Sequence, residues 1–141
     1  MRTVGDLMTR DVITLFDDST LADARAIMKQ RGVRHIPVIN GSTGELLGLL
    51  TQRAMLTVAL NIADQIGIKR LEKVEAQTKV TDIMEPVTRV FTEDDTLLAA
   101  ADYLLANKNT VLCVVRGKEV AGVVSSVDFI RCARHFLQNG N

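Results

Sequence analysis

The chain has 141 residues, of which 47% are hydrophobic and 24% charged, and its 17 basic and 17 acidic residues leave no formal net charge. This composition is typical of a globular α/β protein with room for one domain or two small fused halves. Balanced charge provides no general attraction to nucleic acid, and no apolar run reaches the roughly 20 residues of a membrane-spanning helix. We therefore expect a cytoplasmic protein that binds no membrane, and local basic clusters leave nucleic-acid binding disfavoured but not excluded.

The first half of the chain predicts the order β-α-β-β-α. A short extended segment is expected at Val12–Leu15, and Thr20 is a candidate N-cap, because its side-chain oxygen can accept from a free N–H of the following helix. Gly32 is expected to end that helix. Apolar runs then predict strands at 33–39 and 45–51, followed by a helix over Gln52–Ile66.

A charged stretch separates the two halves. Residues 67–78 are predicted to be a linker, because the run IKRLEKVEAQTK is typical of a solvent-exposed helix end and loop.

The second half predicts the same elements in the same order. They are an extended segment at Thr88–Phe91, a helix after the N-cap candidate Thr96, strands at 110–115 and 119–125, and a helix over Ser126–Leu137.

The two halves also align in sequence. At an offset of 76 residues, Asp6-Leu7-Met8 matches Asp82-Ile83-Met84, and HIPVI matches VLCVV. After a turn that is two residues shorter, GLLTQRA (48–54) matches GVVSSVD (122–128). The chain is therefore predicted to hold a first repeat at 1–66 and a second at 79–141.

These motifs, in this order and duplicated, resemble a tandem pair of CBS (cystathionine β-synthase-type) domains, a Bateman module of the stand-alone class. The resemblance implies an α/β fold in which two β-α-β-β-α repeats pack around a pseudo-two-fold axis. It also implies a cleft that binds an adenine nucleotide (AMP, ADP or ATP) or, alternatively, S-adenosylmethionine. The bound ligand would regulate an unidentified partner protein, and the module would form a homodimer.

The stretch GVVSSVD admits two interpretations. In the first, Ser125 and Asp128 only cap the last helix, because S/T-x-x-acid is close to a capping box. In the second, the helix N-terminus and the Ser125 hydroxyl also bind a phosphate, while Asp128 accepts from the two hydroxyls of a ribose. The family resemblance favours the second role for both residues.

The first repeat departs from this pattern. Thr51 keeps the hydroxyl, but Ala54 stands where the ribose-binding carboxylate is expected. A methyl group cannot accept a hydrogen bond, so we predict one competent site per chain, centred on the second repeat, and a weaker degenerate site at Thr51.

Other residues are candidates by position. Arg34 and His35 are predicted to approach the phosphates of a nucleotide held by Asp128, with a solvent-exposed arginine and a partly buried histidine as the alternative. Arg53, at the start of the helix after Thr51, has the same two interpretations as Arg34: a contact to a ligand phosphate or a solvent-exposed arginine. Apolar residues could line the base pocket or belong to the core: Met84, Val87 and Val111 at the main site, and Met8 and Val12 at the degenerate one.

Two other functions compete with nucleotide sensing. One is an interaction or dimerisation scaffold whose nucleotide site has decayed, which Ala54 favours and the Ser125–Asp128 pair opposes. The other is an enzyme, but no Ser-His-Asp pattern, acid pair or metal-ligand set stands out. Cys113 and Cys132 are distant and apolar-flanked, as expected for reduced packing residues without a metal.

Overall fold

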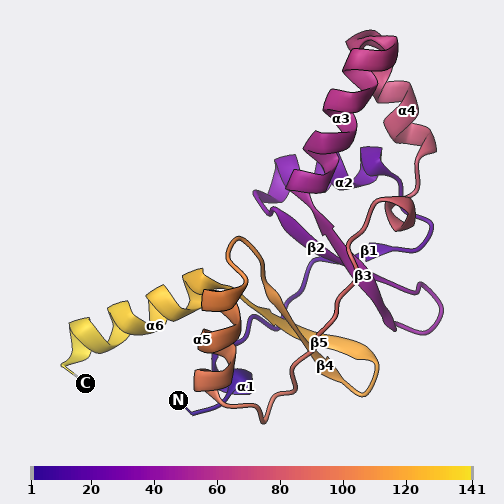
Figure 1. Ribbon diagram of the computed structural model, residues 1–141. Coiled ribbons are helices and arrows are strands. Elements are labelled where there is room, and N and C mark those ends of the chain that lie inside the picture. The colour runs from indigo at the N-terminus through magenta and orange to yellow at the C-terminus, as the bar shows by residue number, and fades with distance from the viewer. Residues whose placement is uncertain (1, 141) are drawn as a thin grey trace. The chain divides into compact units, whose positions relative to one another are not determined.

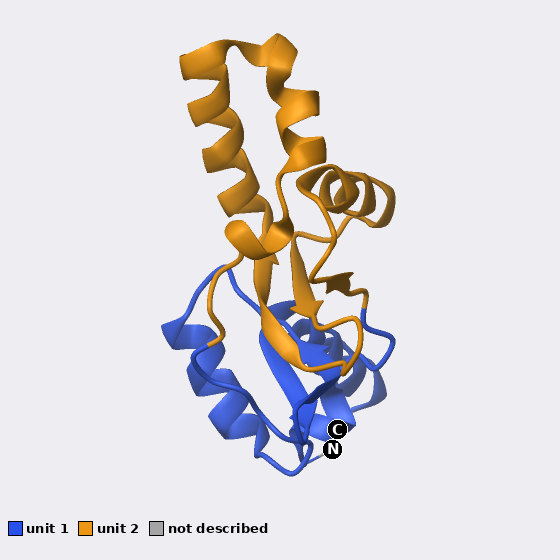
Figure 2. Cartoon of the chain, turned by 90° about the vertical axis from the view of Figure 1, so that its right-hand side faces the viewer, with its two compact units in different colours: residues 1–12, 88–141 blue, residues 13–87 orange. Residues whose placement is uncertain are grey.

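A computed structural model describes residues 2–140 and divides the chain into two compact units (Figures 1 and 2). Unit 1 combines Met1–Val12 with Thr88–Asn141, and unit 2 is Ile13–Val87. Each unit therefore contains the body of one predicted repeat together with the first residues of the other. The compact units and the predicted repeats, 1–66 and 79–141, do not share boundaries.

Unit 2 is a three-stranded sheet covered by helices. Strand β1 (Leu15–Phe16) pairs parallel to β2 (His35–Ile39), which pairs antiparallel to β3 (Leu46–Thr51). The helices are α2 (Leu21–Arg31), α3 (Gln52–Ile66), α4 (Leu71–Gln77) and the short 3-10 helices η1 (Ile68–Arg70) and η2 (Val80–Asp82). The apolar faces of these elements meet in one core, which includes Leu21, Ile36, Leu50 and Val80.

Local signals fix the ends of α2. The Asp23 N–H donates to the Thr20 hydroxyl at 3.2 Å, and the Thr20 N–H donates to the Asp23 carboxylate at 2.9 Å. At the other end Gly32 adopts φ 68°, a conformation that costs glycine little, and its N–H donates to the Met28 carbonyl. The predicted cap, the predicted stop and the predicted bounds of α3 are confirmed.

Unit 1 has a two-stranded antiparallel sheet of β4 (Leu112–Arg116) and β5 (Glu119–Val124). Its helices are α1 (Val4–Leu7), α5 (Leu97–Ala106) and α6 (Ser126–Asn139). Thr96 caps α5 as predicted, accepting from the Ala99 N–H at 3.1 Å. A separate core forms here around Val4, Phe91, Leu112 and Val124.

The first extended segment of each repeat is shorter than the sequence predicted. In unit 2 the strand covers only Leu15–Phe16 instead of Val12–Leu15, and in unit 1 Phe91 makes a single parallel bridge to Val114. Each segment meets only one edge of its sheet, so few main-chain groups find partners there. The overall β-α-β-β-α pattern is retained in both units.

The segment predicted as a linker, 67–78, folds into η1 and α4 and is more helical than the expected helix end and loop. Most of its residues are exposed as expected, but Glu75 on α4 is only 3% exposed. Both oxygens of Glu75 accept from the Arg25 guanidinium on α2 at 2.6 Å, and this bonding raises the pKa of Arg25. A carboxylate that is buried in this way needs its partner, so α4 is tied to α2.

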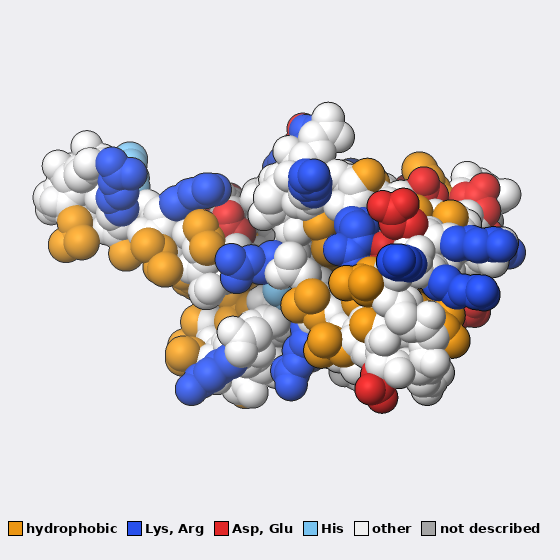
Figure 3. Space-filling view, turned by 90° about the horizontal axis from the view of Figure 1, so that it is seen from above, with side chains coloured by type: hydrophobic (Ala, Val, Ile, Leu, Met, Phe, Trp, Pro, Cys, Tyr) orange, Lys and Arg blue, Asp and Glu red, His pale blue; other side chains and the backbone are white. Residues whose placement is uncertain are grey.

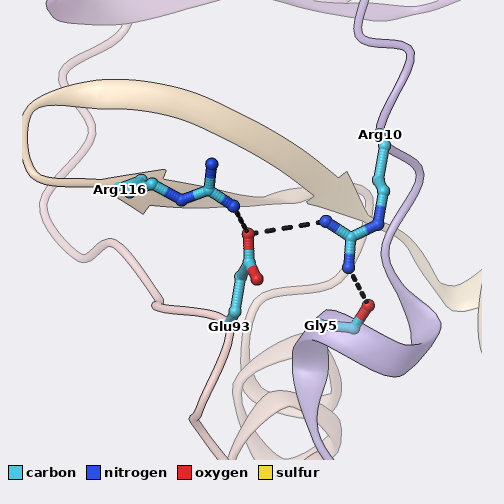
Figure 4. A network of polar contacts seen from close by, with 4 residues as sticks. All are labelled: Gly5, Arg10, Glu93 and Arg116. Atoms are coloured by element: carbon cyan, nitrogen blue, oxygen red, sulfur yellow. Dashed lines mark hydrogen bonds and ion pairs between the residues drawn. The ribbon is translucent and has the colours of Figure 1, made fainter.

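The N-terminal segment is tied into unit 1 by main-chain and side-chain contacts. The Val4 N–H donates to the Asp95 carbonyl at 2.8 Å, and the Gly5 N–H donates to the Glu93 carbonyl at 2.9 Å. The Glu93 carboxylate also accepts from Arg10 and Arg116, while Arg10 donates to the Gly5 carbonyl at 3.0 Å (Figure 4). This network explains why residues 1–12 belong with the second half of the chain.

Candidate functional site

In each unit, the residue directly after the matched methionine (Met8 or Met84) forms one antiparallel bridge with the last strand of the sheet. We call the stretch that contains this residue the incoming segment. In unit 1, Thr9 and Val123 exchange N–H to carbonyl bonds of 2.9 and 3.0 Å. In unit 2, Leu49 and Glu85 exchange bonds of 2.9 and 2.8 Å. Thr9 and Glu85 are separated by the repeat offset of 76, so they occupy equivalent positions in the two units.

A glycine on the last strand allows each of these close approaches. A Cβ added to Gly122 would lie 2.6 Å from the Met8 sulfur and 2.9 Å from the Thr9 carbonyl oxygen. A Cβ added to Gly48 would lie 2.6 Å from the Met84 sulfur and 2.9 Å from the Glu85 carbonyl oxygen. The two bridges therefore have the same local structure, and in each of them one methionine side chain packs against the glycine.

In unit 1 the bridge lies beside the start of α6. The Asp128 carboxylate accepts from the Ser125 N–H at 2.9 Å and from the Ser125 hydroxyl at 3.4 Å. Its other oxygen accepts from the Thr9 hydroxyl at 3.4 Å. Asp128 therefore contacts both the helix cap and the incoming segment. Because the side chain is half-buried, its remaining acceptor capacity is open to a ligand.

Unit 2 has the same backbone arrangement and different side chains. Thr51 is the N-cap of α3 and is only 6% exposed, and its hydroxyl accepts from the Ala54 N–H at 3.0 Å. The Gln52 N–H donates to the Arg34 carbonyl at 2.8 Å, and His35 pairs with Thr51 in the sheet register. Arg34 and His35 therefore lie beside the start of α3.

The apolar candidates divide between the two units. Met8 is buried in the core of unit 1, Val12 ends the N-terminal segment of that unit, and Val111 is half-buried just before β4. Met84 packs against the core of unit 2, and Val87 ends that unit. The sequence grouped Met84 and Val87 with Asp128, whereas it is Met8 that shares a compact unit with Asp128. Arg53 is exposed at the start of α3.

Thr9 is the position that sequence reasoning missed. It belongs to no recognisable motif, and it reaches Asp128 from a segment distant in sequence. The available signal was its place directly after Met8, in the motif that the repeat offset aligns with Met84.

Other kinds of site find little support within residues 2–140. No group of three His, Cys, Asp or Glu side chains there could hold a metal ion. In the same range, no helix has the length and apolar character needed to cross a bilayer. Burial raises the pKa of the Cys113 thiol to about 11, which keeps it protonated and unreactive near neutral pH.

Comparison with known families decides the classification. The model of the CBS domain matches residues 4–61 and again 80–135. The chain belongs to the CBS domain family. It carries two CBS domains in tandem, and their order agrees with the repeat seen in the sequence.

Solved CBS-domain structures share this fold. CBSX2 from Arabidopsis thaliana matches with a TM-score of 0.81 and 24% identity over 96% of each chain. CBSX2 in complex with AMP matches over the whole of both chains with a TM-score of 0.79. The CBS domain pair of protein MJ0100, in complex with 5-methylthioadenosine and S-adenosyl-L-methionine, matches with a TM-score of 0.72 and 20% identity, over 94% of this chain and 96% of that one.

Curated relatives include enzymes that are much longer than this chain. Inosine-5'-monophosphate dehydrogenase from Chlorobaculum parvum is 32% identical over 75% of the chain, which spans 19% of that enzyme. A-adding tRNA nucleotidyltransferase from Geobacter sulfurreducens is 26% identical over 93% of the chain, which spans 13% of that protein.

Proposed function

We propose that this CBS pair is a non-catalytic regulatory module that binds an adenine nucleotide or adenosyl compound at the start of α6. Asp128 would hold the ribose and Ser125 the phosphate. The observation that carries the proposal is the Asp128 carboxylate, which is positioned by Ser125 and Thr9 and remains half-buried rather than paired with a cation.

The ribose role follows from hydrogen-bond chemistry. A carboxylate accepts at both oxygens, and a ribose presents two adjacent hydroxyl donors, so the pair can form two charge-assisted bonds. The existing donors to Asp128 fix its orientation before a ligand arrives, which reduces the entropy lost on binding. A helix cap alone requires the bond from the Ser125 N–H but has no need of Thr9.

The phosphate role follows from the helix end. Helix α6 is 14 residues long, and the first N–H groups of a helix, together with its dipole, favour an anion. The Ser125 hydroxyl, whose single proton is donated to Asp128 in the free chain, can turn to donate to a phosphate oxygen instead. Asp128 would repel a phosphate placed against it, so the sugar must lie between the carboxylate and the phosphate.

Support for an adenosyl ligand comes from the relatives. CBSX2 has been captured with AMP, and MJ0100 with 5-methylthioadenosine and S-adenosyl-L-methionine. The enzymes among the curated relatives extend far beyond the part that this chain matches. We therefore assign this chain a regulatory role, in which a partner protein distinguishes the bound from the free state.

Calorimetric titration with AMP, ADP, ATP and S-adenosylmethionine tests the site. Asp128→Ala should weaken binding of the preferred ligand at this site at least about tenfold, since two charge-assisted bonds are lost. Asp102→Ala is the matched control, because Asp102 lies exposed on α5 of the same unit. Absence of binding by the wild type would instead favour a scaffold with a decayed site.

We also propose that the module is a homodimer that docks through helical faces. Exposed hydrophobic side chains occur on α3 (Leu56, Leu60, Ile66) and on α6 (Val127, Ile130, Leu137). Figure 3 shows hydrophobic side chains along one side of α6 and basic ones along the other. Sedimentation equilibrium should give twice the chain mass, and Leu60→Glu or Ile130→Glu should shift it toward the monomer. A wild-type monomer would refute this part of the proposal.

A further inference from the structure

We propose that two copies of the chain pair through α3 in antiparallel orientation, so that a two-fold axis relates the two α3 helices. The proposal rests on the homodimer proposed above and specifies one of its contacts, between unit 2 of one copy and unit 2 of the other. The partner of the exposed face of α3 is then a second copy of the same helix. The order of charged and apolar side chains along α3 leads to this choice.

Four exposed side chains form one stripe along α3. Arg53, Leu56, Leu60 and Asp64 follow one another at spacings of three, four and four residues, which places them on one face of the helix. Leu56 is 53% exposed and Leu60 is 71% exposed, whereas Met55 on the core side is 3% exposed. Helix α4 runs alongside α3 (Figure 1) but leaves the stripe exposed. The stripe is therefore an apolar pair with a base at one end and an acid at the other.

The two charges lie at the unfavourable ends of α3. The N-terminus of a helix carries partial positive charge and its C-terminus partial negative charge, so acids stabilise the first turn and bases the last. Helix α2 follows this rule, with Asp23 in its first turn and Lys29 and Arg31 in its last. Helix α3 reverses it, because Arg53 lies in the first turn and Asp64 in the last. Within residues 2–140, neither side chain has a hydrogen bond or an ion pair.

An antiparallel second copy of α3 compensates both charges. With the two-fold axis near Val58, Asp64 of the second copy lies beside Arg53, and Leu60 of the second copy lies beside Leu56. Each charge then also lies near the helix end of opposite sign on the other copy. Because a two-fold contact is self-complementary, each of these pairings occurs twice. A stripe that is unfavourable in one chain becomes favourable in a pair.

Helix α6 has the equivalent place in unit 1 but lacks this self-complementary order. It too exposes apolar side chains, such as Ile130. Its charged residues after Asp128, however, are Arg131 and Arg134, both basic. Two antiparallel α6 helices would bring Arg131 of one copy close to Arg134 of the other, and like charges repel. The charge order therefore favours α3 against α3 over α6 against α6.

Charge reversal tests the α3 pairing. Arg53→Glu and Asp64→Arg should each weaken the dimer at least about tenfold in sedimentation equilibrium, because each places like charges together at two points. The double variant R53E/D64R restores opposite charges and should dimerise like the wild type. Each new charge suits its own end of α3, so these variants should retain the helical circular dichroism of the wild type. Gln65→Arg, exposed on another face of α3, is the control that should leave the dimer unchanged.

Mixing the two single variants provides a second test. In a mixed dimer of one Arg53→Glu chain and one Asp64→Arg chain, both charge contacts join an acid to a base. Two variants that each repel their own copies should therefore form heterodimers about as tightly as the wild type forms homodimers. Native mass spectrometry of chains with tags of different mass measures this recovery. A contact between α3 and α6 of the second copy would give no such recovery, because α6 is unchanged in both variants.

The outcomes separate this pairing from the proposed function. If the wild type dimerises but charge reversal has no effect, or if mixing yields no heterodimer, the α3 pairing is refuted and the homodimer stands. A wild-type monomer would refute the homodimer and the pairing together. The nucleotide site is independent of both results, since AMP titration of Asp128→Ala tests it separately.

Discussion

Unit 1 and unit 2 share a backbone arrangement and differ in the third residue of the helix that follows the last strand. Both place a bridge, a methionine and a glycine beside the first turn of that helix. In unit 1 the third residue is Asp128, which accepts from Ser125 and Thr9, and in unit 2 it is Ala54, which has no acceptor. The comparison teaches that the same main-chain geometry can be present with and without the side chain that could bind a sugar.

The units also differ in the chain beyond the site helix. In unit 2, α3 leads through η1 into α4, and the Arg25–Glu75 pair fastens α4 to α2. In unit 1, α6 is the last described element, and it carries exposed hydrophobic side chains. The first arrangement adds polar contacts within its unit, while α3 and α6 both leave apolar surface for another molecule to cover.

The largest stability effect is expected from breaking the shared bridge. Gly48→Ala and Gly122→Ala should each lower the free energy of unfolding by about 1–3 kcal/mol, because the added Cβ overlaps a methionine sulfur and a carbonyl oxygen. Denaturant titration measures the loss. The control is Gly41→Ala, whose added Cβ meets nothing nearer than 3.4 Å. A loss in only one of the two variants would show that the bridges are not equivalent.

A smaller effect is expected from the contact found only in unit 2. Glu75→Gln should cost about 1 kcal/mol, less than the loss of a fully buried ion pair, because the Arg25 side chain is 47% exposed and solvent screens it. Hydrogen exchange should quicken in α4 and remain unchanged in α5 and α6. Glu72→Gln is the control on the same helix, and unchanged exchange in α4 would contradict the role given to the pair.

Local features of the fold were predictable because their causes are local. Thr20 and Gly32 delimit α2 through contacts with residues three or four positions away, and the bounds of α3 follow from Thr51 and the apolar pattern after it. The repeat offset exposed the duplication. In the candidate site, the Ser125–Asp128 contact was predictable for the same reason, since the two residues lie within one helical turn.

The rest depended on contacts between segments distant in sequence. Nothing in residues 1–12 indicates that they pack with the second half, because the bonds of Val4 and Gly5 are to main-chain groups that carry no sequence label. The burial of Glu75 was hidden for a similar reason, since its partner Arg25 lies on another helix. Thr9 escaped notice because only its bridge to Val123 brings it beside Asp128.

The most direct test of the central claim compares AMP with 2′-deoxy-AMP. In the wild type, we expect removal of the 2′-hydroxyl to weaken binding about tenfold, because the bond to Asp128 is lost. In the Asp128→Asn variant, discrimination between the two ligands should shrink several-fold. Equal discrimination with and without the carboxylate would contradict the account, because Asp128 would then not be the group that contacts the ribose.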